Sequence, residues 1–235
     1  VQVGIQSMAD RYTYIPLIGL FIIIAWGLVD LVPQWSRRKI VLSTIATGIL
    51  LSLMFLSFLQ VRYWKNSITL FEHALKVTTH NFVAHNNLGT ALKDQGRIAE
   101  ATGHYHEALR IFPGYAKAHN NIGAAMEDQG RIAEAISHYS EALRFDPDNA
   151  LIHYNLGHVL GEQDRTGEAI RHYVKALQIK PDFADAHNNL GIALLRIGKI
   201  TLAIAHFQEA VRLKPDSEIM QKNLKSTLSV SRRVR

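Results

Sequence analysis

The feature that most constrains the fold of this chain is a repeat of 34 residues. Four glycines, Gly89, Gly123, Gly157 and Gly191, return at this interval, each inside a close copy of the phrase Asn-Asn-Leu-Gly. A period of this length is typical of helical hairpins that bury their apolar faces by stacking on one another. The repeat therefore predicts four full units, at residues 82–115, 116–149, 150–183 and 184–217.

Other positions return in step with the glycines and describe the packing of one hairpin. Small residues allow the two helices of a unit to approach closely, an aromatic residue fills the space between hairpins, and a proline ends the second helix. These positions hold Ala101, Ala135, Ala169 and Ala203; Tyr105, Tyr139, Tyr173 and Phe207; and Pro113, Pro147, Pro181 and Pro215. The pattern resembles the tetratricopeptide (TPR) repeat, which implies an all-α fold with a TPR α-solenoid.

The turns and the ends of the array can also be predicted. Gly96, Gly130 and Gly198 lie where the first helix of a unit turns into the second, while the third repeat has Asp164 there. Asp tolerates the left-handed conformation better than most residues, so we expect a slightly strained turn. Stacked arrays need capping units, and we assign them to a half-repeat at residues 66–81 and a polar helix at residues 218–228, followed by a basic tail at residues 229–235.

The other strong feature is apolar sequence near the start of the chain. Ile40 to Val61 is 22 residues without a charge, which as a helix would span roughly 33 Å, enough to cross a bilayer core. Ile15 to Val32 is a second candidate. We therefore expect two transmembrane helices within residues 15–65, joined by a short basic loop at residues 33–39 and preceded by an extramembrane loop at residues 1–14. A buried soluble hairpin is the alternative.

Charge argues against nucleic acid as a partner. The chain has a formal net charge of +6, but residues 82–217 carry 14 basic and 16 acidic side chains. A nucleic-acid groove needs its positive charge on the folded surface, whereas here the excess lies at the predicted membrane flanks and in the tail. The absence of cysteine is compatible with any compartment, because a stacked array needs no disulfide.

A second resemblance concerns the segment that leads into the first apolar run. Gln6 to Gly19 contains Asp-Arg-Tyr-Thr-Tyr-Ile-Pro-Leu-Ile-Gly, which looks like a stretch of bacterial membrane proteins with C-terminal TPR arrays. Those proteins are similar to the eukaryotic transmembrane-and-TPR O-mannosyltransferases. The resemblance implies a GT-C type glycosyltransferase that uses a polyprenyl-phosphate sugar. It also implies an extracytoplasmic array.

The basic loop agrees with that orientation. Arg37-Arg38-Lys39 would stay in the cytoplasm by the positive-inside tendency. We therefore expect an integral protein of the bacterial inner membrane, with its TPR array on the extracytoplasmic side. In the resembled family the catalytic acid belongs to an early lumenal loop that this sequence does not contain. We interpret the chain as a fragment and predict no catalytic residue and no cofactor in it.

Asp10 and Arg11 lie next to the predicted membrane surface, where they could contact a lipid phosphate. Pairing with each other or with headgroups is the alternative, and it is favoured.

Two histidine ladders invite a metal interpretation. One comprises His85, His119, His153 and His187, and the other His104, His138, His172 and His206. The ligands of one metal must converge, whereas equivalent residues of successive hairpins are spread along the solenoid. We therefore predict no metal site and assign the first ladder to hairpin packing.

Asparagines on the first helix of each unit are the candidate peptide-binding residues. They comprise Asn87, Asn121, Asn155 and Asn189, with Asn86, Asn120 and Asn188 beside them and Tyr154 interrupting the second row. Asn is a poor helix former, and its carboxamide can both donate and accept hydrogen bonds. A row of such groups could hold an extended peptide backbone, as the resemblance to the TPR superhelix of O-GlcNAc transferase implies. Hydrogen bonding only to neighbouring helices is an equally weighted alternative.

Three functions remain open on this evidence. The leading one is a membrane-anchored TPR scaffold that binds an extended protein segment. The second is the acceptor-recruiting part of a membrane glycosyltransferase that uses a polyprenyl-phosphate sugar. The third is an array that only drives self-association, which would leave no open groove.

Overall fold

The computed structural model describes residues 38–63 and 66–233, and these residues form eleven helices. The chain divides into two compact units, with the boundary between Ala91 and Leu92. The described helices of the first unit are α2 (Arg38–Tyr63), α3 (Ser67–Val77) and most of α4 (Phe82–Lys93). The second unit holds the remaining helices and is a continuous solenoid.

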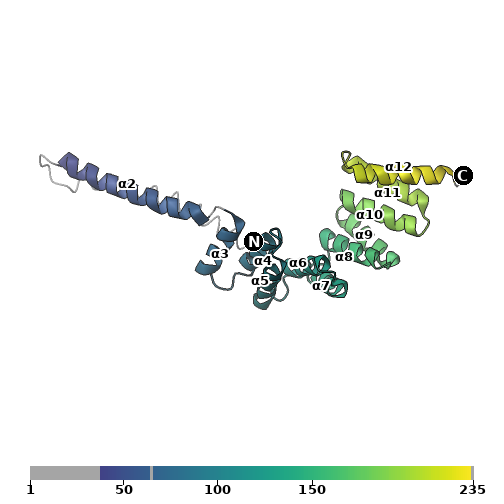
Figure 1. The fold of residues 1–235 in the computed structure, drawn as a ribbon, viewed down its shortest axis with the longest axis horizontal. Helices are drawn as coiled ribbons and strands as arrows, with labels where there is room; N and C mark the ends of the chain where they lie inside the picture. The colour runs from purple at the N-terminus through teal and green to yellow at the C-terminus, as the bar shows by residue number, and fades with distance from the viewer. Residues whose placement is uncertain (1–37, 64–65, 234–235) are drawn as a thin grey trace. The chain divides into compact units, whose positions relative to one another are not determined.

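The solenoid consists of antiparallel hairpins in chain order. Helix α5 (Ile98–Ile111) packs on the first helix of the next hairpin, and a single helix, α12 (Glu218–Arg233), covers the end of the stack. Figure 1 shows the hairpins of this unit following one another toward the C-terminus. The hairpins are α6 (Ala116–Asp128) with α7 (Ile132–Phe145), α8 (Ala150–Glu162) with α9 (Thr166–Ile179), and α10 (Ala184–Arg196) with α11 (Ile200–Leu213).

The membrane-span prediction is wrong for the residues that the structure describes: none of their helices combines the length and the apolar character that crossing a membrane requires. The first predicted span, residues 15–32, lies outside the described residues, as does the loop at residues 1–14. The second falls within α2.

Close contact between glycine and an aromatic ring holds each hairpin together. A methyl group built on Gly123 would lie 2.7 Å from the ring of Tyr139, and one on Gly191 would lie 2.7 Å from the ring of Phe207. The aromatic residues themselves are almost fully buried. The first helix of a hairpin therefore approaches the second at a distance that a side chain on the glycine would prevent.

The turn in the third repeat adopts the predicted conformation. Gly130 and Gly198 have φ of +72°, and Asp164 at the equivalent position has φ of +56°. The backbone is thus the same with and without glycine, and only the steric cost differs.

The C-terminal helix is longer than predicted. Helix α12 continues to Arg233, so it includes much of the segment at residues 229–235 that was assigned to a tail. Its Met220 is buried against Ala184 and Ala210, and its Thr227 is also buried. The helix thus covers the apolar end of the last full hairpin.

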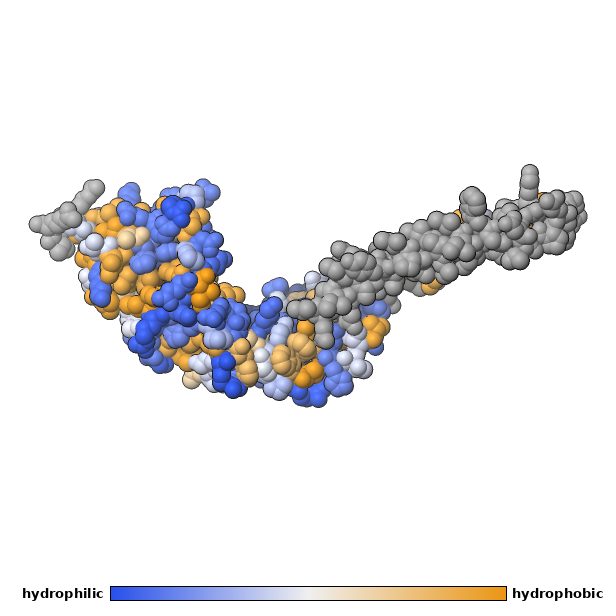
Figure 2. Space-filling view, turned by 180° about the vertical axis from the view of Figure 1, so that it is seen from behind, coloured by the Kyte–Doolittle hydropathy of each residue, from blue (hydrophilic) through white to orange (hydrophobic). Residues whose placement is uncertain are grey.

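The surface of the solenoid keeps some apolar residues among its polar ones, as Figure 2 shows by colour. Val174, Ile192, Ile197 and Leu202 are exposed in the last two hairpins.

Candidate functional site

The predicted asparagines connect successive repeats. Asn155 Nδ2 on α8 donates to Asn120 Oδ1 on α6 at 2.9 Å, and Asn223 Nδ2 on α12 donates to Asn188 Oδ1 on α10 at 2.9 Å. Each pair is separated by 35 residues, so the same register operates at both junctions. The asparagine row therefore links neighbouring hairpins, and it extends into the capping helix.

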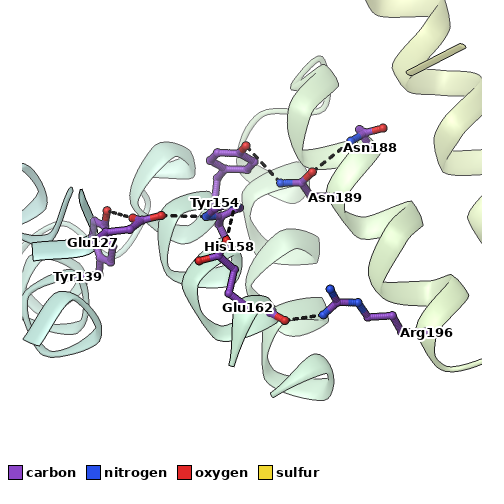
Figure 3. Close-up of polar contacts among 9 residues, drawn as sticks. Glu127, Tyr139, Tyr154, His158, Glu162, Asn188, Asn189 and Arg196 are labelled. Atoms are coloured by element: carbon purple, nitrogen blue, oxygen red, sulfur yellow. Dashed lines mark hydrogen bonds and ion pairs between the residues drawn. The ribbon is translucent and has the colours of Figure 1, made fainter. Parts of the chain in front are cut away.

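Where the row is interrupted, the register is kept by a different group. Asn189 Nδ2 donates to the Tyr154 hydroxyl at 3.3 Å, again across 35 residues. Asn188 Nδ2 donates in turn to Asn189 Oδ1 at 3.1 Å. Figure 3 shows this chain from Tyr154 through Asn189 to Asn188. The phenol oxygen takes the place of the carboxamide oxygen as the acceptor.

The asparagines also differ in burial. Asn86 and Asn188 in the second row are buried, whereas Asn120 of that row and Asn87, Asn121, Asn155 and Asn189 of the first row are half-buried. Among the described residues, Asn155 Oδ1 has no hydrogen-bond donor, and its oxygen is not fully enclosed. Asn155 in the first row therefore keeps hydrogen-bonding capacity that a ligand could use.

A polar cluster at the junction of the second and third repeats was not predicted. His158 Nδ1 on α8 donates to Glu127 Oε1 on α6 at 2.9 Å, and Tyr139 Oη on α7 donates to Glu127 Oε2 at 2.8 Å. His158 Nε2 lies 4.0 Å from Glu162 Oε1. The three ligand atoms of Glu127, His158 and Glu162 all lie within 4.8 Å of one another. Figure 3 shows these side chains reaching toward one another between α6 and α8.

The hydrogen bonds of this cluster shift the pKa values of its members. The hydrogen bond to Glu127 raises the pKa of His158, an effect that exceeds the opposing cost of burial. Burial is the main reason that the pKa of Tyr139 is raised, and its hydrogen bond to Glu127 adds to it. Glu127 therefore accepts from two groups that hold their protons.

The signal for this cluster was present in the sequence as a departure from the repeat. The positions equivalent to His158 hold Thr90, Ala124 and Ile192. His158 and Glu162 are also four residues apart, which places them on one face of a helix. A search for residues that break the repeat pattern would have found them.

Beside this cluster lies a pocket of about 180 Å³ between α8, α9 and α10. Its polar lining includes His158, Glu162, Asn189 and Arg196, and its apolar lining includes Tyr173 and Ile192. Arg196 Nη1 donates to the Gly161 carbonyl at 2.5 Å. The pocket thus adjoins the asparagine row and presents groups of both charges.

The two histidine ladders meet in pairs inside each hairpin of the solenoid. The Nδ1 atoms of His153 and His172 are 3.0 Å apart, and His153 Nε2 lies 3.1 Å from the Pro147 carbonyl oxygen. A carbonyl only accepts, so His153 carries its proton on Nε2 and accepts at Nδ1 from His172. The pairs His119–His138 and His187–His206 repeat the arrangement with Pro113 and Pro181.

This pairing supports the predicted packing role of the first ladder. It also gives the repeated proline a second function, because its carbonyl sets the tautomer of the histidine. The pairing was not predicted, because it joins histidines of the two ladders within one repeat rather than equivalent histidines of different repeats.

Asp10 and Arg11, which were considered for a lipid-phosphate contact, lie outside the described residues.

Together the hairpins, the glycine–aromatic contacts and the constant register between repeats define an α-helical repeat solenoid. A family model described as TPR repeat matches residues 89–130, 128–164 and 162–198, and one described as tetratricopeptide repeat matches residues 184–217. These matches run from residue 89 to residue 217, and the chain belongs to the tetratricopeptide repeat proteins.

Solved structures share this fold. The structure of pilF from Pseudomonas aeruginosa is 27% identical, with a TM-score of 0.61, over 65% of this chain and 69% of that one. The structure of YrrB, described as a TPR protein with an unusual peptide-binding site, is 20% identical, with a TM-score of 0.60, over 69% of this chain and 84% of that one.

Curated relatives match over the repeats. Protein O-mannosyl-transferase TMTC1 of Homo sapiens is 34% identical over 111 residues, which are 46% of this chain and 12% of that protein. Protein O-mannosyl-transferase Tmtc3 of Drosophila melanogaster is 30% identical over 105 residues, or 44% of this chain and 11% of that protein. The matched stretch is thus a small part of each relative.

Proposed function

We propose that the solenoid is a scaffold for protein–protein interaction and that it binds an extended peptide segment along the first helices of its hairpins. The observation that carries this proposal is the half-buried asparagine row next to the pocket between α8 and α10. Asn155 and Asn189 each use part of their hydrogen-bonding capacity to join repeats. The remainder can pair with a peptide backbone, whose donors and acceptors alternate.

The affinity of such a site is modest. Each neutral hydrogen bond contributes about 0.5–1.5 kcal/mol net, and the pocket adds apolar contact from Tyr173 and Ile192. Because carboxamides contact the backbone, unrelated extended sequences should bind to a similar degree. The YrrB structure has this fold and is described as a TPR protein with an unusual peptide-binding site. That description is consistent with the proposal.

The test is a binding assay of the full chain against an array of unrelated 15-residue peptides, at roughly micromolar protein. The variant changes Asn121, Asn155 and Asn189 to Ala, and the control changes Gln178, an exposed residue on α9, to Ala. We expect the asparagine variant to lose binding across the array while the control retains it. Circular dichroism and thermal melting must show that both variants keep their helices. Retained binding by the folded asparagine variant would refute the proposal.

A second candidate follows from the curated relatives. They are named as protein O-mannosyl-transferases, so the array could recruit the acceptor for a glycosyltransferase that uses a polyprenyl-phosphate sugar. We expect such a protein to hold the array on the extracytoplasmic side. The test is mannose transfer from polyprenyl-phosphate mannose to a peptide that the array binds, measured with the protein that contains this chain. Transfer that is insensitive to the asparagine variant would separate catalysis from the proposed peptide binding.

A further inference from the structure

One cluster on the solenoid combines three side chains of types that bind metal ions. The proposed peptide binding does not depend on the contacts among these three side chains. Glu127 projects from α6, while His158 and Glu162 project from α8 one turn apart. We infer that His158 and Glu162 of this cluster bind one divalent transition-metal ion, with Zn²⁺ as the best-matched ion, and that Glu127 of the second repeat orients the histidine for it. The inference does not rest on the proposed peptide binding, although His158 and Glu162 also line the adjoining pocket.

The orientation of the imidazole is the first support. His158 uses Nδ1–H to donate to Glu127 at 2.9 Å, so in the neutral ring the lone pair is on Nε2. That atom faces Glu162, whose Oε1 is 4.0 Å away. Metal-binding histidines commonly donate their other ring N–H to a carboxylate, which fixes the tautomer and the ring plane. Glu127 is itself held by the Tyr139 hydroxyl at 2.8 Å.

The spacing is the second support. Ligands about 2.0–2.1 Å from a tetrahedral ion lie roughly 3.3 Å from one another. The 4.0 Å between His158 Nε2 and Glu162 Oε1 is slightly wider than this. The Glu162 side chain is exposed, so a rotamer change can close the gap. His158 and Glu162 then bind the ion directly, Glu127 orients the imidazole from its Nδ1 side, and water completes the shell.

Charge is the third support. Two carboxylates and one neutral imidazole give the cluster a charge of −2, which a divalent ion balances. A competing cation, Arg196, lines the adjoining pocket. Its guanidinium already donates to the Gly161 carbonyl and lies 3.7 Å from Asp164 Oδ1. An imidazole with carboxylates suits Zn²⁺ and related ions, whereas Mg²⁺ prefers oxygen ligands alone.

The cluster is particular to one junction of the described repeats. At the equivalents of His158 and Glu162, the second repeat has Ala124 and Asp128, and the fourth has Ile192 and Arg196. These replacements remove the imidazole in both cases. The second repeat therefore provides an internal control with an acidic residue but no histidine.

The experiment is calorimetric titration of the full chain with ZnCl₂ after dialysis against a chelator, together with thermal melting at matched ion concentrations. We expect one high-affinity ion per chain and a melting temperature that rises with Zn²⁺, because the ion binds only the folded junction. The same concentration of Mg²⁺ should produce neither effect. His158→Gln and Glu162→Gln should remove this binding event, and Glu127→Gln should weaken it about 10–100-fold, as expected for a group that orients a ligand.

Two control variants separate this site from other histidines and acids. Asp128→Asn removes the equivalent carboxylate of the second repeat, and His172→Gln removes one histidine pair. Both should retain the high-affinity event, whereas Arg196→Gln should tighten it by removing a nearby positive charge. No Zn²⁺ binding by the parent, unchanged affinity in folded His158→Gln, or equal loss in His172→Gln would each overturn the inference.

Discussion

The inside of each hairpin and the junctions between hairpins follow different rules. Inside, the same residues recur in the same roles: a glycine lies against an aromatic ring, as Gly157 does against Tyr173, and a histidine pair is fixed by a proline carbonyl. Between hairpins, the 35-residue register is constant, but the bonded groups change from two carboxamides to a carboxamide and a phenol.

This difference shows which positions can acquire a function. Side chains inside a hairpin are in close van der Waals contact, so a substitution there lowers the stability of the fold. The junction positions need only some hydrogen-bonding group in the correct place. That freedom allows Glu127, His158 and Glu162 to appear at one junction without disturbing the stack.

The largest effect should come from the interior. Replacing Tyr173 with Ala removes a ring that is 3% exposed and leaves a cavity against Gly157. We expect the free energy of unfolding to fall by about 3–5 kcal/mol, measured by urea denaturation followed by circular dichroism. The comparison variant is Tyr154→Ala. The Tyr154 ring is only half-buried, so the free energy of unfolding should fall by less. Equal losses would contradict the distinction between interior and junction.

A second prediction uses the same substitution at two glycines. A methyl group on Gly157 would lie 2.9 Å from the Tyr173 ring, whereas one on Gly103 of α5 would meet nothing within 4 Å. Both changes gain helix propensity, which amounts to roughly 1 kcal/mol, so their difference isolates the clash. We expect Gly157→Ala to be less stable than Gly103→Ala by about 1–3 kcal/mol.

Thermal melting of the two variants and the parent measures that difference. Two equally stabilised variants would show that the hairpin relaxes around a side chain at Gly157, and that close helix approach is not needed there.

The extent to which sequence predicted this structure follows the same division. The interior was predictable because packing imposes a strict period, and even the left-handed Asp164 was anticipated from its place in the repeat. The histidine pairing was missed because residues 19 apart meet only when a hairpin folds back on itself. The junction cluster was missed because it departs from the repeat. The membrane prediction failed for the described part of α2 because absence of charge was taken as sufficient evidence for a span.

The histidine pairs predict acid sensitivity. Burial is the largest cause of the lowered pKa of His153 and His172, and the His153 ring also lowers the pKa of His172. The unfolded chain therefore binds more protons below its ordinary histidine pKa of about 6.5, and stability falls as the pH drops through that value. The surrounding charges of Lys175 and Arg171 lower these pKa values further, and Asp148 and Glu168 oppose them.

Melting temperatures at about pH 7.5 and pH 5.5 test this. A variant with His138, His172 and His206 changed to Gln should lose less stability over this interval than the parent. His158→Gln should lose more stability than the parent over this interval. The pKa of His158 is raised, so in the parent this histidine stabilises the fold at low pH, and that stabilisation is lost as the pH rises. The exposed ion pairs, such as Arg165–Glu168, do not interfere, since the pKa of Glu168 is lowered and it stays ionised in this range. Identical pH dependence in all three proteins would refute the assignment.

At the junctions between hairpins, the coupling free energy should depend more on the 35-residue spacing of the bonded side chains than on whether the acceptor is a carboxamide or a phenol. We expect the double-mutant cycle of Asn155→Ala with Asn120→Ala to give a coupling of about 0.5–1.5 kcal/mol. The cycle of Asn189→Ala with Tyr154→Phe should give a coupling in the same range, although the acceptor there is a hydroxyl. Urea denaturation of the parent and the six variants measures both couplings. A coupling near zero at either junction would mean that apolar packing alone sets the register.

The smallest effect concerns the turn in which one repeat lacks glycine. Asp164 has φ of +56° and its side chain is 96% exposed, so its 3.7 Å contact with Arg196 adds little. Asp164→Gly should relieve the left-handed strain and stabilise the protein by roughly 0.5–1 kcal/mol, somewhat less than the steric cost because glycine also increases the freedom of the unfolded chain. The reverse change, Gly198→Asp, starts from φ of +72° in the equivalent turn and should destabilise by a similar amount. Melting curves of the two variants should therefore shift in opposite directions. If both shift the same way, the two turns differ in more than the residue that occupies the left-handed position, and the equivalence of the repeats would not extend to their turns.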